Sequence, residues 1–537
     1  MSLRTNPVPM PEKKITFKTA ANGTIYVYYT LRAYRNKNGK PTSDEASIGK
    51  KDPVTGMLIP NRKYFELFQG STLPGGISSV KPSLPCRVAS YGNSFSLVSA
   101  ARATGLQEIL SKCFPESWPL ILAVACFMLC EGNVMLYLDD WFDETDIAFA
   151  ERIDHQRCSR LFAAISHDER MRFFREWLKH RSEQEYIAYD VTSISTYSKS
   201  IDIAEWGYNR DNESIPQINL GMFYGAESHM PVYYNMYSGS ISDKSHLVFM
   251  MADTKKLGIA NTRFVLDRGF VTEGNLKYMK DKEYLFVTAF PQHLLEAKRL
   301  IDACKSDIRK AANRIGAFGV YALSADTEIY GFKMKAHIYF DPEKQALDEK
   351  ELYAHIERLK TDLERMEKTK RATKKYTDFF IVEQEKAGGF NFALNNEKID
   401  ARINRTGFFI LLNNDASLSS EDVLKLYRGR DAIEKNFDQL KNGLDFRRLR
   451  THVNQTTDGK VFIGFLALIL RSYLLRKLKD DQKTKHLTLE KVLLELRKIK
   501  LVTFEDLSRV LLPLTKMQKT ILDALGLSSN ELQSSFS

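Results

Sequence analysis

Four polar residues share one side of a predicted helix over residues 420–441. Tyr427, Arg430, Glu434 and Lys441 follow one another with the spacing Tyr-x2-Arg-x3-Glu-x6-Lys. At about 100° per residue, their side chains point within roughly 60° of one another around the helix axis. A carboxylate can hold a metal ion, while cations and a phenol beside it can hold phosphate oxygens. The spacing predicts a site for a phosphodiester, with Glu434 as the metal ligand.

An apolar stripe beside these residues argues against a purely solvated helix face. The stripe consists of Leu426, Ile433, Phe437 and Leu440. The alternative is a surface helix carrying charge pairs at i and i+4. A polar arc next to a buried stripe fits a helix packed at a site better than such a surface helix.

Two further carboxylates close predicted strands. Asp190 ends the apolar run 186–190, and Asp267 ends the run 263–267. Either aspartate alone could be a cap or a turn residue. Carboxyl ends of strands can converge at one edge of an α/β sheet, where such sheets bind ligands. Their joint placement therefore predicts a shared site.

The elements around these acids alternate between strands and helices. Ser419-Ser420-Glu421-Asp422 is typical of a helix start, and Gly443 fits the end of that helix. The order of elements predicts an α/β fold. The predicted strands are 186–191, 217–224, 232–237, 262–266, 284–289 and 406–414, and the predicted helices are 242–257, 274–280 and 420–442.

The helix motif resembles the signature of bacterial insertion-sequence transposases of the DDE type. Asp190-Val191-Thr192 and Asp267-Arg268-Gly269-Phe270 are similar to the two aspartate motifs of that family. The stretches 207–220 and 239–243 are similar to further family segments. The likeness extends over residues 186–450.

The resemblance implies a catalytic mechanism and its partners. It implies an RNase H-like core in which Asp190, Asp267 and Glu434 are catalytic and bind two Mg²⁺ ions, with Mn²⁺ as a substitute. Tyr427, Arg430, Lys441 and Arg268 would bind DNA phosphates. The implied activity is cut-and-paste transposition: binding of terminal inverted repeats, endonuclease cleavage and transfer of the ends into target DNA. A homodimer in a synaptic complex is implied as well.

The chain is expected to have six parts. Basic residues of the N-terminal part, including Arg32, Arg35 and Lys40, are candidates for phosphate contacts. The parts are a β-rich region 1–85 and a helical region 86–183, both candidates for DNA binding, the first part of the core 184–290, an insertion subdomain 291–405, the second part of the core 406–455, and a helical C-terminal region 456–537 that is a candidate for dimerisation.

Composition sets the broad class. The 537 residues are 43% hydrophobic and 27% charged, which excludes a mainly disordered chain. Lys and Arg number 78 against 67 Asp and Glu, and the net charge of +11 favours a polyanionic partner. The six cysteines form no Cys-x-x-Cys pair, as expected in a reducing cytosol. With no membrane span predicted, we expect a cytoplasmic, nucleoid-associated bacterial protein.

Two alternatives to an active transposase remain open at this stage. A structure-specific nuclease with the same RNase H-like fold would prefer branched DNA over terminal repeats. A catalytically inactive DNA-binding derivative would bind DNA without metal-dependent cleavage. All three acids are present, which argues against the second alternative.

Overall fold

The computed structural model of the chain describes residues 7–35, 39–68, 85–181, 185–209, 213–258, 263–365, 374–384, 390–430, 437 and 439–535. The chain divides into two compact units. One comprises Met1–Cys86 with Phe504–Ser508, and the other comprises Arg87–Thr503 with Arg509–Ser537. Each unit has a hydrophobic core of its own.

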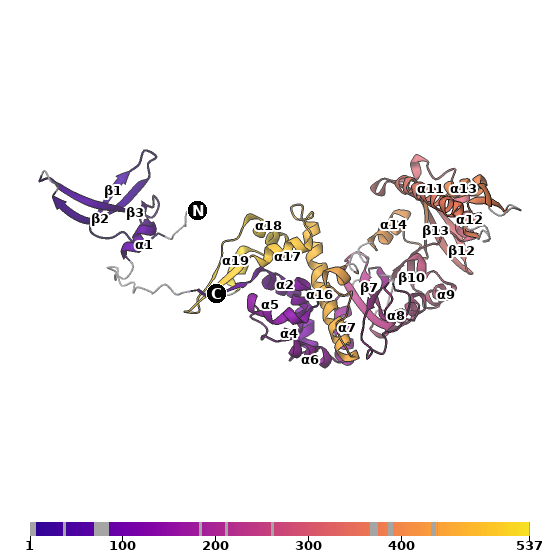
Figure 1. Cartoon of the computed structure of the whole chain (residues 1–537), viewed down its shortest axis with the longest axis horizontal. Helices are drawn as coiled ribbons and strands as arrows, with labels where there is room; N and C mark the ends of the chain where they lie inside the picture. The colour runs from indigo at the N-terminus through magenta and orange to yellow at the C-terminus, as the bar shows by residue number, and fades with distance from the viewer. Residues whose placement is uncertain are drawn as a thin grey trace. The chain divides into compact units, whose positions relative to one another are not determined.

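The smaller unit is a four-stranded antiparallel sheet with one short helix (Figure 1). Val27, Ile48, Leu58 and Tyr64 form its buried core. The strands, in sheet order, are β1 (Ile15–Thr19), β2 (Ile25–Arg35), β3 (Pro41–Lys51) and β4 (Leu58–Pro60), and the helix is α1 (Arg62–Phe68). The sequence analysis expected residues 1–85 to be β-rich, and the described elements among them are these four strands, the helix and the first residue of β5 (Pro85–Ser90).

Six α-helices follow β5 (Pro85–Ser90) near the start of the larger unit. They are α2 (Gly92–Ala103), α3 (Leu106–Cys113), α4 (Trp118–Glu131), α5 (Leu138–Glu144), α6 (His155–Ala164) and α7 (His167–Arg181). Helix α4 is almost wholly buried and packs against α16 (Asn454–Asp480). Among the described residues no single helix is long and apolar enough to span a membrane. The helical segments Trp118–Glu131 and Met135–Glu144 have that length and apolar composition only when they are taken together, and the chain bends by 110° between them.

A nine-stranded mixed sheet forms the centre of the larger unit. Its order is β11-β12-β13-β16-β10-β9-β6-β7-β8. Strand β6 pairs antiparallel with β7 and parallel with β9, and β9 pairs parallel with β10. The strands are β6 (Ile187–Ser195), β7 (Gln217–Gly225), β8 (Pro231–Ser238), β9 (Arg263–Leu266), β10 (Leu285–Ala289), β11 (Arg314–Ile315), β12 (Val320–Ile329), β13 (Phe332–Phe340) and β16 (Phe408–Asn413).

Helices cover both faces of this sheet. On one face lie α8 (Asp243–Lys256) and α9 (Glu273–Asp281), and the His246 ring of α8 stacks on Tyr237 of β8 at 3.6 Å. On the other face lie α7 and α16, where Phe465 meets Tyr234 of β8 at 5.3 Å. Tyr234 and Tyr237 point to opposite faces because side chains alternate along a strand.

Residues 291–405 contribute to two different structures. After α10 (Leu295–Cys304), strands β11 to β13 extend the large sheet through β16. A small separate core follows, built by α11 (Pro342–Glu364), α12 (Lys374–Thr377), β14 (Phe380–Gln384), β15 (Phe390–Leu394) and α13 (Asn396–Ile403). The heptad-spaced residues Ile356, Leu359 and Leu363 of α11 are buried in that core, so they serve an intramolecular contact.

The C-terminal residues contain helices and strands. The helices expected there are α16, α17 (Leu489–Arg497), α18 (Lys516–Ala524) and α19 (Ser529–Ser534). Strands β17 (Lys500–Phe504) and β18 (Arg509–Leu511) were not expected, and they form a small sheet with β5 (Pro85–Ser90). Their partner β5 is distant in sequence, so local pattern alone does not reveal this sheet.

Candidate active site

Asp190 is the one position of β6 that is not fully buried. The other eight residues of the strand are buried, and Asp190 is half-buried. Its Oδ1 atom accepts a hydrogen bond of 2.8 Å from the backbone N–H of Val191. A carboxylate in so apolar a strand is costly unless it meets polar groups or ions, so its position is typical of a functional group.

Asp267 follows directly on β9 and caps the short helix Arg268–Phe270. Its backbone stays extended, with φ −75° and ψ 160°, and its Oδ1 accepts a hydrogen bond of 2.8 Å from the Arg268 N–H. The side chain is 36% exposed. The exposed carboxylate edge leaves room for a further ligand.

Parallel pairing of β6 and β9 brings the two aspartates to the same level. Ile187 pairs with Phe264, and Ala188 pairs with Val265. Continuing this register by two residues sets Asp190 beside Asp267. Neighbouring strands lie about 4.8 Å apart, and side chains alternate between faces. Both carboxylates therefore point from the same sheet face. The prediction that both aspartates end their strands is wrong for Asp190, which lies inside β6, because the strand continues to Ser195.

Tyr427 and Arg430 reach Asp267 from helix α14 (Ser420–Gly429) and its C-terminal cap. The Tyr427 hydroxyl donates to Asp267 Oδ1 at 3.2 Å, and an Arg430 guanidinium nitrogen lies 3.7 Å from the same oxygen. The Arg430 guanidinium also lies over the Tyr427 ring, 5.4 Å from its centroid. Arg430 is only 9% exposed. The two residues therefore brace Asp267 from the helix side.

Burial controls the protonation state of Tyr427. It raises the pKa of the hydroxyl well above its ordinary value, and the Asp267 carboxylate adds to the rise while Arg430 opposes it. The hydroxyl therefore keeps its proton at physiological pH. Tyr427 acts as a fixed hydrogen-bond donor to Asp267.

Local sequence explains why α14 presents these residues. Ser419 and Asp422 form a capping box, which fixes the first residue of the helix as predicted. Val423, Leu424 and Leu426 are buried, and α14 packs against β9, β10, β12 and β16. The buried stripe turns Tyr427 toward the end of β9.

Glu434 lies outside the described residues, and described residues flank it on both sides. Before it, Tyr427 and Arg430 contact Asp267. After it, the Phe437 ring lies 6.2 Å from the ring of Tyr224, which pairs with Ala188 on β6. These contacts tie both flanks of the segment to the face of the sheet that carries the aspartates.

Tyr224 and Arg471 are neighbours of the site that sequence reasoning missed. Burial raises the pKa of Tyr224 far above its ordinary value, with Arg471 opposing the rise and Asp190 adding to it. Arg471 is buried in α16. In the sequence Arg471 only interrupts an apolar run, and that interruption is the one signal that could have drawn attention to it.

The other two predicted phosphate ligands, Arg268 and Lys441, differ in their exposure to solvent. Arg268 is exposed next to Asp267. Lys441 is buried in the π-helix Gln439–Gly443, which ends at the glycine predicted to end the motif helix. The described contacts therefore bring together Asp267, Tyr427 and Arg430.

Described residues of the segments 207–220 and 239–243 meet beside the carboxyl end of β6, where Gly207 approaches Gly239 and Gln217 pairs with Ser195. A Cβ atom on Gly207 would lie 1.8 Å from the carbonyl oxygen of Gly239, so only glycine allows this approach. Asn219 is buried and donates to the carbonyl of Gly239 at 3.3 Å. Trp206 and Tyr208, the neighbours of Gly207 in sequence, are 65% and 81% exposed.

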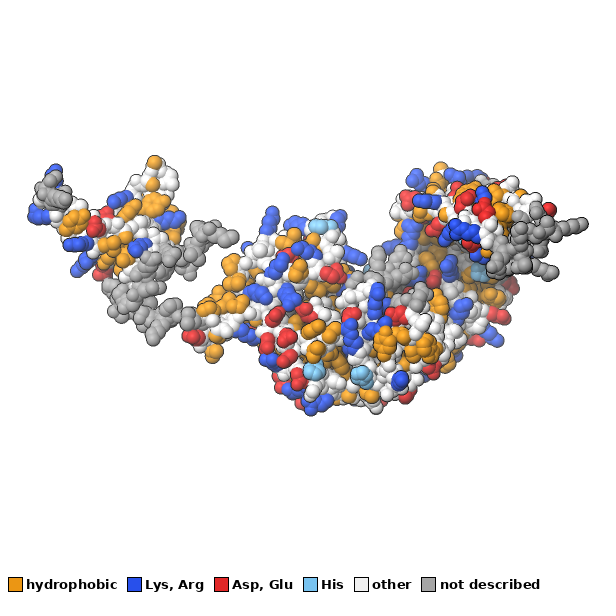
Figure 2. Space-filling view, in the orientation of Figure 1, with side chains coloured by type: hydrophobic (Ala, Val, Ile, Leu, Met, Phe, Trp, Pro, Cys, Tyr) orange, Lys and Arg blue, Asp and Glu red, His pale blue; other side chains and the backbone are white. Residues whose placement is uncertain are grey.

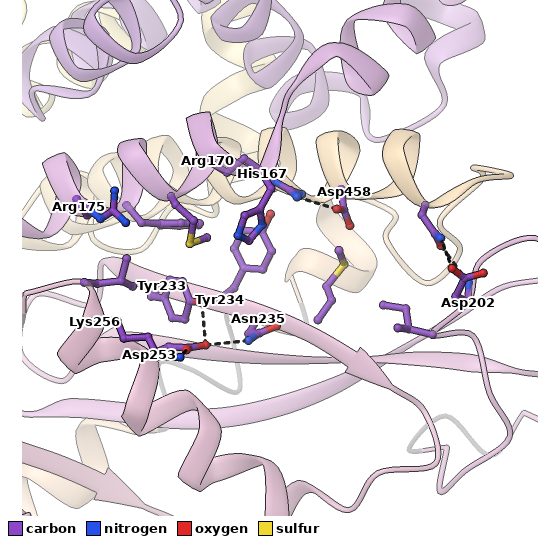
Figure 3. A pocket seen from close by; sticks show the side chains of 16 residues that line it. His167, Arg170, Arg175, Asp202, Tyr233, Tyr234, Asn235, Asp253, Lys256 and Asp458 are labelled. Carbon is purple, nitrogen blue, oxygen red and sulfur yellow. Dashed lines mark hydrogen bonds and ion pairs between the residues drawn. The ribbon is translucent and has the colours of Figure 1, made fainter.

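A separate cavity lies at β8, the edge strand of the large sheet. Its volume is about 570 Å³, and it opens between α7, β8, α8 and the start of α16 (Figure 3). Arg170 pairs with Asp458 at 2.7 Å, and Asp253 accepts from Asn235 at 3.2 Å (Figure 3). These contacts join the elements around the cavity, and Asp190 and Asp267 are not among its lining residues.

Comparison with known proteins places these features in a family. A family model described as "Transposase DDE domain" matches residues 181–470, more than half of the chain. No curated protein matches the chain. Among solved structures, a cryo-EM structure of the piggyBac transposase synaptic complex with hairpin DNA shares 8% identity, covering 78% of this chain and 84% of that chain with a TM-score of 0.31.

Proposed function

From the premise that the chain belongs to the transposase DDE domain family, we propose that it cuts DNA at the ends of a mobile element and transfers those ends into target DNA. One observation carries the proposal. Asp190 and Asp267 share a level on adjacent parallel strands, and Tyr427 and Arg430 brace Asp267 from a helix on the same sheet face. This arrangement supports a shared site for Asp190, Asp267 and the described part of the helix motif.

The strand order supports an RNase H-like core. Strands β8, β7, β6, β9 and β10 are neighbours in that order, with the first three antiparallel and β6, β9 and β10 parallel. Asp190 then lies on the first strand of the core and Asp267 at the end of its fourth. The family resemblance assigns the two aspartates to these strands.

The acids fit a divalent cation of the magnesium type. Carboxylate oxygens are the ligands that Mg²⁺ prefers, and Asp190 and Asp267 both keep partly exposed carboxylates on one face. The described residues hold no cluster of three His, Cys, Asp or Glu side chains, and Glu434 is the proposed third ligand. Asp190, Asp267 and Glu434 would hold two Mg²⁺ ions, which would supply activation of a water or hydroxyl nucleophile and stabilisation of the leaving oxygen.

The chain's own residues position the acids and the DNA. Tyr427 donates to Asp267 and fixes its rotamer, while Arg430 offsets its charge. Arg268 is exposed next to Asp267 and contacts a phosphate beside the cut bond in this proposal. Lys441, which is buried in the π-helix Gln439–Gly443, is the second cation of the helix motif and a further phosphate ligand in this proposal.

The proposed partners follow from the reaction. The protein binds terminal inverted repeats and target DNA, and two copies hold two ends together in a synaptic homodimer. The net charge of +11 supports a polyanionic partner.

End cleavage tests the proposal. The protein is incubated with a duplex that carries the element's terminal repeat, with Mg²⁺ or with EDTA. We expect Mg²⁺-dependent nicking at the repeat boundary that Asp267→Ala and Glu434→Ala abolish. Glu351→Ala, which removes an exposed carboxylate of α11, serves as the matched control and should cleave normally. Binding without cleavage in Mg²⁺ and Mn²⁺ would refute the catalytic proposal in favour of an inactive DNA-binding derivative.

A further inference from the structure

The positive charge of the chain is concentrated in residues 1–86, which form most of the smaller unit; Glu505 and Asp506 in the remainder of that unit reduce its charge to +6. Residues 1–86 contain 13 Lys and Arg against 5 Asp and Glu, which gives +8 of the total +11. The remaining residues are almost balanced, with 65 basic and 62 acidic side chains. In the space-filling view, Lys and Arg side chains lie beside hydrophobic ones on this unit (Figure 2). So strong an asymmetry points to a polyanion as the partner of this unit.

The unit also projects a two-stranded ribbon. Strands β2 and β3 pair along their full lengths, while β1 pairs only with residues 25–29 and β4 only with residues 49–51. Beyond the irregularity between Thr30 and Arg32, every residue of 31–35 and 41–44 is exposed. Nothing among the described residues covers either face of this tip.

Polar side chains line one face of the tip. Arg32 pairs across the ribbon with Asp44, and Tyr34 pairs with Thr42. The Arg32 guanidinium lies 5.9 Å from the centroid of the Tyr34 ring, and the Tyr34 hydroxyl donates to Asp44 at 3.3 Å. These residues form one face of the ribbon, with donors and acceptors oriented by contacts within the ribbon.

Arg35 points from the opposite face because it is an odd number of residues from Arg32. One guanidinium nitrogen donates to the carbonyl of Gly39 at 2.9 Å, which orients the side chain at the end of the ribbon. Within the described part of the chain, neither Arg32 nor Arg35 forms an ion pair with a carboxylate. Both cations keep donors for a ligand.

We infer that the β2–β3 ribbon enters the major groove of the DNA at the element's end and reads its sequence there. The inference rests on the proposed function for the identity of the polyanion. A major groove about 12 Å wide and 8.5 Å deep admits a two-stranded ribbon. Five residues of the tip extend about 17 Å, which is the rise of roughly five base pairs.

The two ribbon faces have different tasks in this arrangement. The face of Arg32, Tyr34 and Thr42 meets base edges, where arginine can form a bidentate contact with guanine. Arg35 on the other face contacts a phosphate, which adds affinity for any sequence. The two arginines can therefore be separated by experiment.

Binding of the full chain to two duplexes tests the inference. Fluorescence anisotropy is measured in EDTA, with a duplex of the element's end and a scrambled duplex of equal length, at several salt concentrations. Arg32→Lys keeps the charge but loses the planar fork. We expect it to reduce the preference for the element's end by about 5-fold to 150-fold with an unchanged salt slope.

Arg35→Gln is expected to act differently. It should weaken binding to both duplexes alike and reduce the salt slope by about 0.9, the value for one phosphate interaction. Lys516→Gln with Lys519→Gln removes exposed charge from α18 in the other unit and is the control, expected to change neither quantity. The tip is exposed, so melting temperatures of all variants should equal that of the parent.

The outcomes distinguish the ribbon from the catalytic proposal. If Arg32→Lys and Arg35→Gln bind both duplexes like the parent, the ribbon is not the reader, even where Mg²⁺-dependent cleavage persists. If the parent prefers the element's end through the ribbon but never cleaves it, the ribbon assignment stands and the catalytic proposal fails. A parent that binds neither duplex overturns the ribbon assignment and points to another anionic partner.

Discussion

Replacing Tyr427 with Phe tests whether the helix motif acts through Asp267. The substitution removes the hydroxyl that donates to Asp267 Oδ1 at 3.2 Å. It keeps the aromatic ring, on which the Arg430 guanidinium lies at 5.4 Å. The substitution therefore removes the hydrogen bond that orients the carboxylate and preserves the stacking of Arg430 on the ring.

The size of the effect follows from the exposure of Asp267. A hydrogen bond to a charged group contributes about 1.5–3 kcal/mol. Since the Asp267 side chain is 36% exposed, water can replace part of this interaction, and the lower end of that range applies. A loss of about 1.4 kcal/mol in the transition state corresponds to a tenfold lower rate. We expect cleavage about tenfold slower, with unchanged affinity for the uncut DNA end.

Single-turnover cleavage with pre-bound DNA measures this change, and Tyr353→Phe on α11, where the tyrosine is 52% exposed, is the matched control. Burial raises the pKa of Tyr427 far above its ordinary value, so its hydroxyl stays protonated over this range. The ratio of parent to Tyr427→Phe rates should therefore stay constant from about pH 6 to about pH 9. A Tyr427→Phe rate within twofold of the parent would show that the hydrogen bond to Asp267 has no catalytic importance.

Three further predictions concern stability, each measured by urea unfolding. Burial lowers the pKa of His246 to about 4, so the unfolded state binds a proton first as the pH falls. The free energy of unfolding should fall by about 2 kcal/mol from pH 7 to pH 5, a loss that His246→Asn should remove. Gly207→Ala should lower the free energy of unfolding by about 2 kcal/mol because the added Cβ atom would lie 1.8 Å from the carbonyl oxygen of Gly239. An unchanged free energy of unfolding would contradict this close approach of the two backbones. Burial in α16 lowers the pKa of Lys460 to about 8, which shows that the charged form is disfavoured there. Lys460→Met should therefore raise the free energy of unfolding by about 2 kcal/mol at pH 7. A lower free energy of unfolding would indicate that the fold needs the positive charge of Lys460.

The strands that carry the aspartates were predictable because their apolar runs are short and dense. The prediction ended the first strand at Val191, whereas β6 continues to Ser195. Ser193 and Ser195 resemble loop residues by composition. In the structure both are buried and hydrogen-bonded, Ser193 to Asn219 and Ser195 to Asn209. Polar partners on other elements, which local pattern does not contain, extend the strand.

The site was only partly predictable for a similar reason. Spacing placed Tyr427 and Arg430 in one arc, but it could not say which carboxylate they would meet. That depends on the register of β6 with β9 and on the packing of α14. The spacing argument also assumed uniform α-helical turns as far as Lys441. The π-helix at residues 439–443 has wider turns, so the direction of Lys441 departs from that assumption.

The long interval between Asp267 and Glu434 is explained by the position of β16. This strand follows the residues that build β11–β13 and the small separate core, yet it lies between β10 and β13 in the sheet. The chain therefore returns to the large sheet as β16, which only β10 separates from β9, before α14 begins. Because β16 is anchored on both sides, α14 starts from a fixed point and packs across β9 and β10. Inserted residues can thus be numerous without displacing the helix that braces Asp267, since the sheet itself sets where that helix starts.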